Sequence, residues 1–514
     1  MARINSNIPG LIARANLARA NQDLEVRLER LATGLKINRG ADNPAGLIVS
    51  ERLRSEISGL NQAIANSDRA SSVIATAEGA LAEISDLLNS IKGLVVEAAN
   101  TGAISAEERR ANQLQIDSAI ESITRISNAA SFGGLKLLNG SLEYVLSGLA
   151  STDISKAIVT GANFAGQPNI QVNVEVVQSA QTANLFLNGD HADPALPDGA
   201  LASAMTLEIA GPLGVQVLEF LAGTELDDVR DAINAFTAAT GVSASLINNN
   251  ILSGLRFSST TYGSEAFVSV KRLGGPPGGG SFQTYQIVGN GEVPADFSFS
   301  TFPPGNLSAS NRDTGRDVTA IVNGNLGSGR GLHLSVQNST SLSLELLLNV
   351  DFATRNGSTS TFYITGGGAL YQLGGEINSS QQLNLGLQSV AASRLGGTLI
   401  DGQLHFLSDL KSGGKADLRS EQFAHASAIL EAAIDEISVM RGRLGALERN
   451  TLQTNVRSLQ AAIENLTASE SAIRDADFAA ETSALSRAQI LAQTGTSVLT
   501  LANQQAQQVL QLLQ

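Results

Sequence analysis

The most regular hydrophobic pattern lies at the end of the chain, from Leu485 onward. Small or apolar residues recur there at alternating intervals of three and four, the spacing of a helix that packs along one face. No charged residue follows Arg487, and eight glutamines do. Since a solvated helix face normally carries charge, we expect this helix to contact protein on several sides. The repeating positions are Leu485, Ala488, Ala492, Gly495, Leu499, Ala502, Ala506, Val509 and Leu513.

The first segment of the chain predicts a helix over about 5–36. It carries two apolar stripes, of which we expect the first to pack on the C-terminal repeat. Its arginines are spread around the helix, which favours a solvated or subunit-facing surface over a membrane-bound one. The first stripe is Ile4, Ile8, Leu11, Ala15 and Ala18, and the second is Leu17, Leu24, Leu28, Leu31 and Leu35.

Three further helices are predicted. One runs over 44–99, with Asp42 or Asn43 as its cap and Pro44 at its first position. One runs over 105–128, opened by Ser105 and Glu108 as a capping box. Helix returns at about 418. The buried seams of the two long segments are expected at Leu53, Ile57, Leu60, Ile64, Ile74, Leu81, Ile84, Leu88 and Ile91, and at Leu452, Val456, Leu459, Ile463 and Leu466, with an interruption of the first at Ser67 and Ser71.

Between these helical ends the pattern changes to strands. Asn139-Gly140 predicts a hairpin turn between 135–138 and 142–145. An α+β module at about 203–272 has strands at 205–209, 215–221, 242–247, 255–259 and 267–271. Its helix is expected over 225–239, capped by Thr224, with Phe236 on its apolar face. A further strand alternates over 342–350, and 274–280 is a glycine-rich loop. The fold class is therefore α + β, with long terminal helices paired as coiled coils around a β-rich insert.

Composition narrows the function without naming a reaction. The net charge of −14 argues against general nucleic-acid binding, and the absence of cysteine excludes disulfides and thiolate metal sites. The four histidines, His191, His333, His405 and His425, lack ligand-like spacing, so we expect no metal, no cofactor and no enzyme activity. Asp475, Asp477 and Glu481 are expected on one helix, beside Arg474, as an ion-paired or solvated face. No secretory signal or membrane-spanning segment is expected.

Two stretches carry a specific resemblance. Residues 28–54 (LERLATGLKINRGADNPAGLIVSERLR) and 441–491, which include NLTASESAIRDADFAAE at 465–481, closely resemble bacterial flagellin. The resemblance covers about 1–140 and 415–514. The 203–272 module looks like a small α+β unit found inserted in some flagellins and hook-associated proteins.

The resemblance implies a structural subunit of the flagellar filament used for swimming. It implies an inner coiled-coil domain of 1–40 and 476–514, a helical domain with a β-hairpin of 41–180 and 385–475, and a variable outer domain of 181–384. The implied partners are copies of the chain, an export chaperone on the C-terminal helix, and the filament cap and hook–filament junction proteins. The implied location is the extracellular filament, reached unfolded through the flagellar type III system without a cleaved signal.

Two alternatives remain open at this stage. A hook–filament junction protein shares the terminal helices, although the 465–481 motif favours flagellin, and the outer domain could act as an adhesin.

In flagellins sensed by a vertebrate innate receptor, the stretch matching 88–97 carries an arginine and a glutamate where Ser90 and Gly93 stand here. We therefore expect weak receptor recognition of Leu88, Asn89, Ser90, Lys92 and Gly93.

Overall fold

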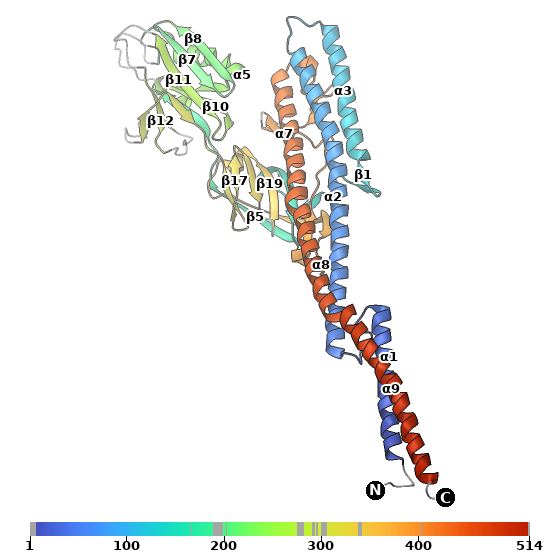
Figure 1. The fold of residues 1–514 in the computed structure, drawn as a ribbon. Coiled ribbons are helices and arrows are strands. Elements are labelled where there is room, and N and C mark those ends of the chain that lie inside the picture. Colours follow the sequence, from blue (N-terminus) through green and yellow to red (C-terminus); the bar gives the residue numbers. More distant parts are fainter. Residues whose placement is uncertain are drawn as a thin grey trace. The chain divides into compact units, whose positions relative to one another are not determined.

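The computed structural model describes residues 7–164, 166–188, 199–201, 203–274, 282–289, 293, 297–299, 306–337, 342–400 and 402–511. The chain forms two compact units, one of 1–71, 372–382 and 447–514, and one of 72–371 and 383–446. The boundary falls within α2 (Pro44–Ala98) and again at the last residue of α7 (Phe423–Leu447). The expected fold class is confirmed, because long helices at both ends of the chain flank a β-rich insert in the sequence (Figure 1).

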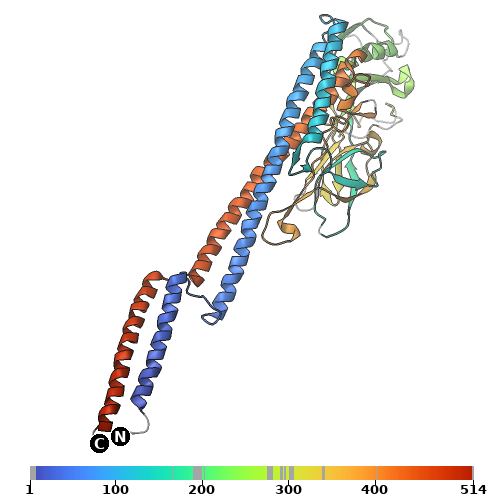
Figure 2. The same ribbon diagram turned by 90° about the vertical axis from the view of Figure 1, so that its right-hand side faces the viewer.

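The first unit contains two antiparallel helix pairs. α1 (Ile8–Thr33) lies beside α9 (Phe478–Gln511), and both ribbon views draw them together (Figure 2). The early part of α2 contacts α8 (Gln453–Arg474), because Asn455 Nδ2 lies 3.3 Å from Ser67 Oγ and Arg474 Nη1 lies 2.8 Å from Glu51 Oε1. α8 thus runs antiparallel to α2. The 372–382 loop is fixed to this pair by a 2.8 Å bond from Asn455 Nδ2 to Leu373 O.

The second unit begins with a helical layer made from α2, α3 (Ala106–Ala129) and α7. The predicted seam of α2 is buried throughout this unit, and α3 contributes Ile116, Ile120 and Ile123 to the buried apolar residues. Ser105 forms the predicted capping box with Glu108. Asn43, rather than Asp42, caps α2, because its Oδ1 accepts from Gly46 N at 3.0 Å. Ser67 does not interrupt the seam: it is buried, and its hydroxyl donates to Ala63 O.

A β sandwich follows, with one hydrophobic core between two sheets. Its strands come from two distant stretches of sequence, about 144–178 and 319–367, so neither stretch completes the sandwich alone. One sheet has the order β16-β15-β5-β20-β3 and the other β17-β18-β19-β4. The strands are β3 (Tyr144–Ser147), β4 (Ile154–Ala162), β5 (Ile170–Gln178), β15 (Thr319–Val322), β16 (Asn325–Leu326), β17 (Ser328–Arg330), β18 (His333–Gln337), β19 (Leu342–Leu348) and β20 (Thr359–Gly367).

The outer module lies between these stretches in sequence and has its own core. Its sheets have the orders β13-β12-β6-β10-β9 and β14-β11-β7-β8. Gln181 and Arg316 pair as an antiparallel bridge where the chain enters and leaves the module. The strands are β6 (Thr182–Leu187), β7 (Met205–Gly211), β8 (Gly214–Phe220), β9 (Val242–Leu246), β10 (Leu255–Tyr262), β11 (Phe267–Gly274), β12 (Thr284–Ile287), β13 (Leu307–Ala309) and β14 (Arg312–Thr314).

The remaining elements are short. They are β1 (Ser131–Phe132), β2 (Leu135–Lys136), α4 (Leu226–Asn234), α5 (Thr237–Thr240), α6 (Val350–Ala353), β21 (Ala369–Gln372), β22 (Gln382–Leu385), β23 (Thr398–Ile400) and β24 (Gln403–His405), with single helical turns at 247–249, 251–253, 379–381, 407–410 and 418–420. A π-helical turn, Glu448–Leu452, joins α7 to α8.

Several local predictions were wrong. The Asn139-Gly140 hairpin does not form; β1 and β2 pair around Gly133-Gly134, and the strand after Gly140, β3, pairs with β20. The helix expected over 225–239 is split into α4 and α5, Phe236 is exposed, and Glu225 rather than Thr224 precedes α4. The helix expected from about 418 starts at Phe423. α1 ends at Thr33 instead of about 36, because Gly34 adopts a left-handed conformation that terminates it.

Candidate assembly interface on the terminal helices

Contacts between α1 and α9 follow a heptad seam. Of the residues between 485 and 503, only Leu485, Ala488, Ala492, Gly495, Leu499 and Ala502 are buried or half-buried. Ala488 is 1% exposed and Ala502 8%. These are the predicted repeat positions within that range. Ala506 and Val509 lie on α9, and Leu513 lies outside the described residues.

The face of α1 that meets this seam differs from the predicted one. Its buried or half-buried positions include Gly10, Ala13, Leu17, Ala20, Leu24, Arg27 and Leu31, again at intervals of three and four; Val26, Glu29 and Arg30 are half-buried beside them. Ile8 is 47% exposed and Leu11 62%, and Ala15 and Ala18 are exposed as well. The prediction that this stripe is the intramolecular partner of α9 was therefore wrong for its described members. Ile4 lies outside the described residues.

Small residues explain why this face of α1 is used. Gly10 and Ala13 let the two backbones approach closely, which a stripe of large side chains cannot do. Gly495 shows how close the helices are, because a Cβ added to it would lie 3.2 Å from Leu17 Cδ1 and 3.6 Å from Leu17 Cα. Leu17, Leu24 and Leu31 lie on this face, whereas Ile8, Leu11, Ile12 and Leu28 are left on the outer side of the pair.

A polar contact fixes the end of the pair at which α1 begins. Asn7 caps α1 by accepting from Gly10 N at 2.9 Å. The amide nitrogen of the same side chain lies 3.3 Å from Ala502 O and 3.3 Å from Asn503 Oδ1 of α9. One asparagine therefore starts α1 and sets its position along α9.

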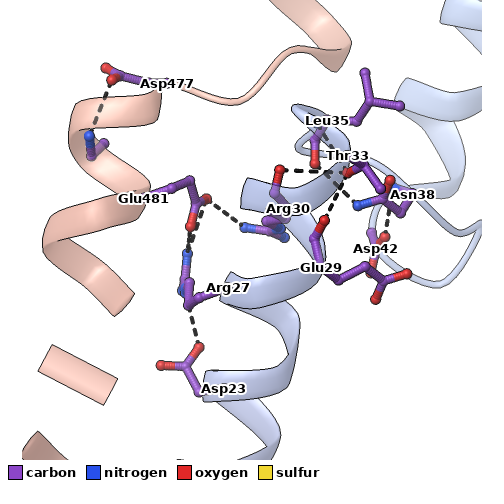
Figure 3. Close-up of polar contacts among 11 residues, drawn as sticks. Asp23, Arg27, Glu29, Arg30, Thr33, Leu35, Asn38, Asp42, Asp477 and Glu481 are labelled. Carbon is purple, nitrogen blue, oxygen red and sulfur yellow. Dashed lines mark hydrogen bonds and ion pairs between the residues drawn. The ribbon is translucent and has the colours of Figure 1, made fainter. Parts of the chain in front are cut away.

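An ion-pair cluster fixes the other end (Figure 3). Glu481 is 7% exposed and stands four residues before Leu485, so it occupies the next seam position. Its carboxylate accepts from Arg27 Nη1 at 2.9 and 3.2 Å and from Arg30 Nη1 at 3.1 Å. Arg27 Nε also lies 3.2 Å from Asp23 Oδ1. Sequence reasoning missed this pairing, although extending the three–four spacing back from Leu485 points to Glu481.

The pKa of Glu481 lies below its ordinary value. Burial acts to raise this pKa, and the hydrogen bonds and positive charges of Arg27 and Arg30 outweigh it. The pKa of Arg27 is raised, chiefly by its bond to Glu481 and against the effect of burial. The cluster is therefore charged at neutral pH and joins two segments from opposite ends of the chain.

α1 ends and α9 begins beside a short antiparallel backbone bridge. Leu35 and Asp475 form an antiparallel bridge, with Lys36 N donating to Arg474 O at 2.7 Å and Ala476 N to Gly34 O at 2.9 Å. Asp475 thus separates α8 from α9, and Asp477 Oδ1 caps α9 by accepting from Ala479 N and Ala480 N. The prediction of one helix carrying Asp475, Asp477 and Glu481 was wrong. Arg474 pairs with Glu51 instead of with these carboxylates.

The other predicted site residues fall into two groups. In the second unit Ile74, Leu81, Ile84, Leu88 and Ile91 are buried. In the first unit Leu452 is buried, and the others are half-buried: Leu53, Ile57, Leu60, Ile64, Val456, Leu459, Ile463 and Leu466. In the 88–97 stretch, for which weak receptor recognition was expected, Leu88 is buried and Asn89, Ser90 and Gly93 are exposed. Lys92 Nζ lies 3.2 Å from Glu431 Oε1.

Among the described residues, no three His, Cys, Asp or Glu side chains come together as a metal site. His191 lies outside the described residues. No described helix has both the length and the apolar character that a bilayer crossing requires.

Comparisons with known proteins agree on one family. Family models match the bacterial flagellin N-terminal helical region at 4–143, the flagellin C-terminal helical region at 427–513 and the flagellin hook IN motif at 206–261. The B-type flagellin of Pseudomonas aeruginosa is 28% identical over 99% of each chain, and a flagellin of Salmonella typhimurium is 27% identical over 99% of each.

Among solved structures, flagellar hook associated protein-3 from Legionella pneumophila aligns over 82% of this chain and 97% of its own. Its TM-score is 0.29 at 11% identity, too low to bear on the assignment. The alignments with the two flagellins instead cover nearly the whole of this chain. The family models match both terminal helical regions, which contain the α1–α9 pair. This chain belongs to the bacterial flagellin family.

Proposed function

We propose that the α1–α9 pair is the segment through which this chain, a structural subunit of the flagellar filament for motility, contacts other copies of itself. The observation that carries the proposal is the apolar surface left on the outer sides of both helices. On α1 it comprises Ile8, Leu11, Ile12 and Leu28, and on α9 Ile490, Leu491, Val498 and Leu501, each between 47% and 64% exposed.

In an isolated chain these apolar side chains stay in water and forgo the free energy that their burial would contribute. Each large aliphatic side chain contributes about 1.5–3 kcal/mol when fully buried. A pair of helices with one seam between them cannot bury a second stripe on each, so only further protein can cover it. Exposed apolar side chains gathered on a helix surface commonly mark an interaction site. Under this proposal Ile8, Leu11, Ala15 and Ala18 face neighbouring copies, while Leu485, Ala488, Ala492, Gly495, Leu499 and Ala502 hold the pair together.

The remaining expectations belong to the same proposal. The inner domain is 1–40 with 476–514. The expected boundaries at 180 and 385, which separate a helical domain (41–180 and 385–475) from an outer domain (181–384), divide the β sandwich, whose strands come from 144–178 and 319–367. The proposed outer domain is therefore the module between Gln181 and Arg316. The chain acts structurally without catalysis or a cofactor, in the extracellular filament, after unfolded export. Its partners are its own copies, an export chaperone on α9, and the cap and junction proteins. Nucleic acid and membrane are not partners, and receptor recognition of 88–97 is weak.

The two earlier alternatives receive less support. The matched flagellins span the whole chain, including the insert, which favours a filament subunit over a hook–filament junction protein. An adhesin role of the outer module would add to this function and would not replace it.

Hydrogen exchange tests the proposal. In the monomer, amides of α1 and α9 should exchange faster than those of α2 between Ile74 and Ala98, because only one side of each terminal helix is covered. In filaments the same amides should become strongly protected. Equal protection of α1 and α9 in monomer and filament would show that the pair is complete without other copies and would overturn the proposal.

A further inference from the structure

The outer module has an edge strand with an unusual surface. β8 stands at the end of its sheet, with only β7 beside it among the residues that the structure describes. Leu213 is 67% exposed, Val215 59%, Val217 46% and Leu221 77%. Val215 and Val217 of β8, and Leu213 and Leu221 directly beside it in sequence, therefore lie at an edge of the sheet that has no further described strand beside it. At this edge Val217 O accepts from Gln216 Nε2 at 3.2 Å, a side-chain bond that an incoming strand would replace.

The register shows which face these residues occupy. Leu218 and Gln216 stand opposite the buried Leu207 and Ile209 of β7, so the even-numbered residues of β8 face the module core. Since side chains alternate along a strand, Val215, Val217 and Glu219 point to the outer face. The exposed valines are therefore no part of the core.

The composition of β8 lacks the usual protection of an edge. Exposed edges are normally kept from pairing by lysine, proline, a bulge or a very short strand. β8 is seven residues long, reads GVQVLEF, and pairs with β7 without a register shift. The opposite edge of the same sheet, β14, has three residues and carries Arg312 and Asp313. Only one of the two edges is thus shaped to accept a further strand.

We propose that β8 pairs antiparallel with β8 of a second copy of this chain, centred on Val217. This association goes beyond the helical packing of the terminal segments. Its occupant is a strand, because the edge offers backbone donors and acceptors as well as apolar side chains.

Self-complementarity favours a second copy over an unrelated strand. With Val217 opposite its counterpart, Val215 stands opposite Glu219 and Leu213 opposite Leu221. No like charges then face each other, and the exposed leucines cover one another. Copies held in one polymer also have a high effective concentration, which favours a contact too weak for dilute monomers.

The absence of cysteine gives this proposal a clean test. In the full chain, Val217→Cys places one thiol at the centre of the pairing. Residues directly opposite in an antiparallel pair have Cα atoms about 4.5–5.5 Å apart, within the range of about 4.4–6.8 Å that a disulfide spans. Mild oxidation of monomers and of filaments should therefore produce a covalent dimer.

Leu326→Cys is the matched control, because Leu326 is 70% exposed on β16 of the sandwich, outside the proposed contact. Val217→Cys should cross-link at least tenfold faster than this control, in filaments and monomers alike or in filaments alone. Adding Glu219→Gln, at the position opposite Val215, should leave the cross-link in place, whereas Gln216→Pro should abolish it by disturbing the edge. Rates for Val217→Cys equal to the control in both states would overturn the pairing. Filament formation by these variants reports on the terminal helices separately.

Discussion

The carboxylate of Glu481 accepts two hydrogen bonds from Arg27 Nη1, at 2.9 and 3.2 Å, across the seam between α9 and α1. Both residues occupy seam positions that would otherwise be apolar or small. A charged pair at one such position specifies register, because shifting either helix would leave a buried charge without its partner. Asn7 performs a similar role at the other end of the pair.

Replacing Glu481 with glutamine should destabilise the α1–α9 pair by about 1–3 kcal/mol, because Arg27 and Arg30 lose their common anion. The measurement is thermal unfolding of the monomer followed by helical circular dichroism, together with the critical concentration for polymerisation. The variant should show a lower first transition and a higher critical concentration.

Asp23→Asn is the control for this change. Asp23 also contacts Arg27, but its side chain is 48% exposed, so its pairing should contribute no more than about 1 kcal/mol. If Asp23→Asn costs as much as Glu481→Gln, the buried position of Glu481 has no special part in holding the pair.

The same carboxylate should make the pairing sensitive to acid. Because the pKa of Glu481 is lower in the folded chain than its ordinary value of 4.5, its contribution is complete above about pH 4.5. That contribution is lost as the pH falls through the lower folded-state value. The difference in unfolding temperature between wild type and Glu481→Gln should therefore be constant from pH 7 down to about 5 and shrink below that. A difference that grows on acidification would contradict this sign.

Enlarging Gly495 should separate the two helices. A Cβ at this position already lies 3.2 Å from Leu17 Cδ1, so Gly495→Leu forces a shift that costs about 1–3 kcal/mol. Seeded growth should then fall strongly. Thr494→Leu adds similar bulk at the neighbouring exposed position and should be tolerated by the pair itself. Filaments of normal length from Gly495→Leu would disprove the tight seam.

The outer module should be removable without loss of the remaining fold. Gln181 and Arg316 are paired through two backbone hydrogen bonds, of 2.8 and 2.9 Å, where the chain enters and leaves the module. Deleting 182–315 and joining these residues through a short glycine–serine linker leaves every sandwich strand in place. The shortened chain should fold and polymerise, as electron microscopy can show. A deletion starting in β5 instead should unfold the sandwich, because β5 pairs with both β15 and β20.

Much of the helical organisation was accessible from the sequence, since burial along a long helix follows the spacing of its apolar residues. Ile74 to Ala98 shows this, as does the capping box at Ser105. The α1 face was accessible only in part: the second predicted stripe contains Leu17, Leu24 and Leu31 of this face, but Gly10 and Ala13 give a weaker hydrophobic signal than Ile8 and Leu11. Glu481 escaped notice because a charged residue at a seam position has no apolar signal. β3 was misassigned because its partner, β20, lies far along the chain.

Seeded elongation tests the central claim, that the outer stripe of α1 joins neighbouring copies. Purified monomer is added to short filament fragments and the growth is followed by electron microscopy. Leu11→Asp places a charge on the stripe, and Asn21→Asp places the same charge at an exposed polar position of α1. We predict that wild type and Asn21→Asp elongate the fragments while Leu11→Asp stays monomeric with unchanged helix content. Elongation by Leu11→Asp at the rate of wild type would contradict the account.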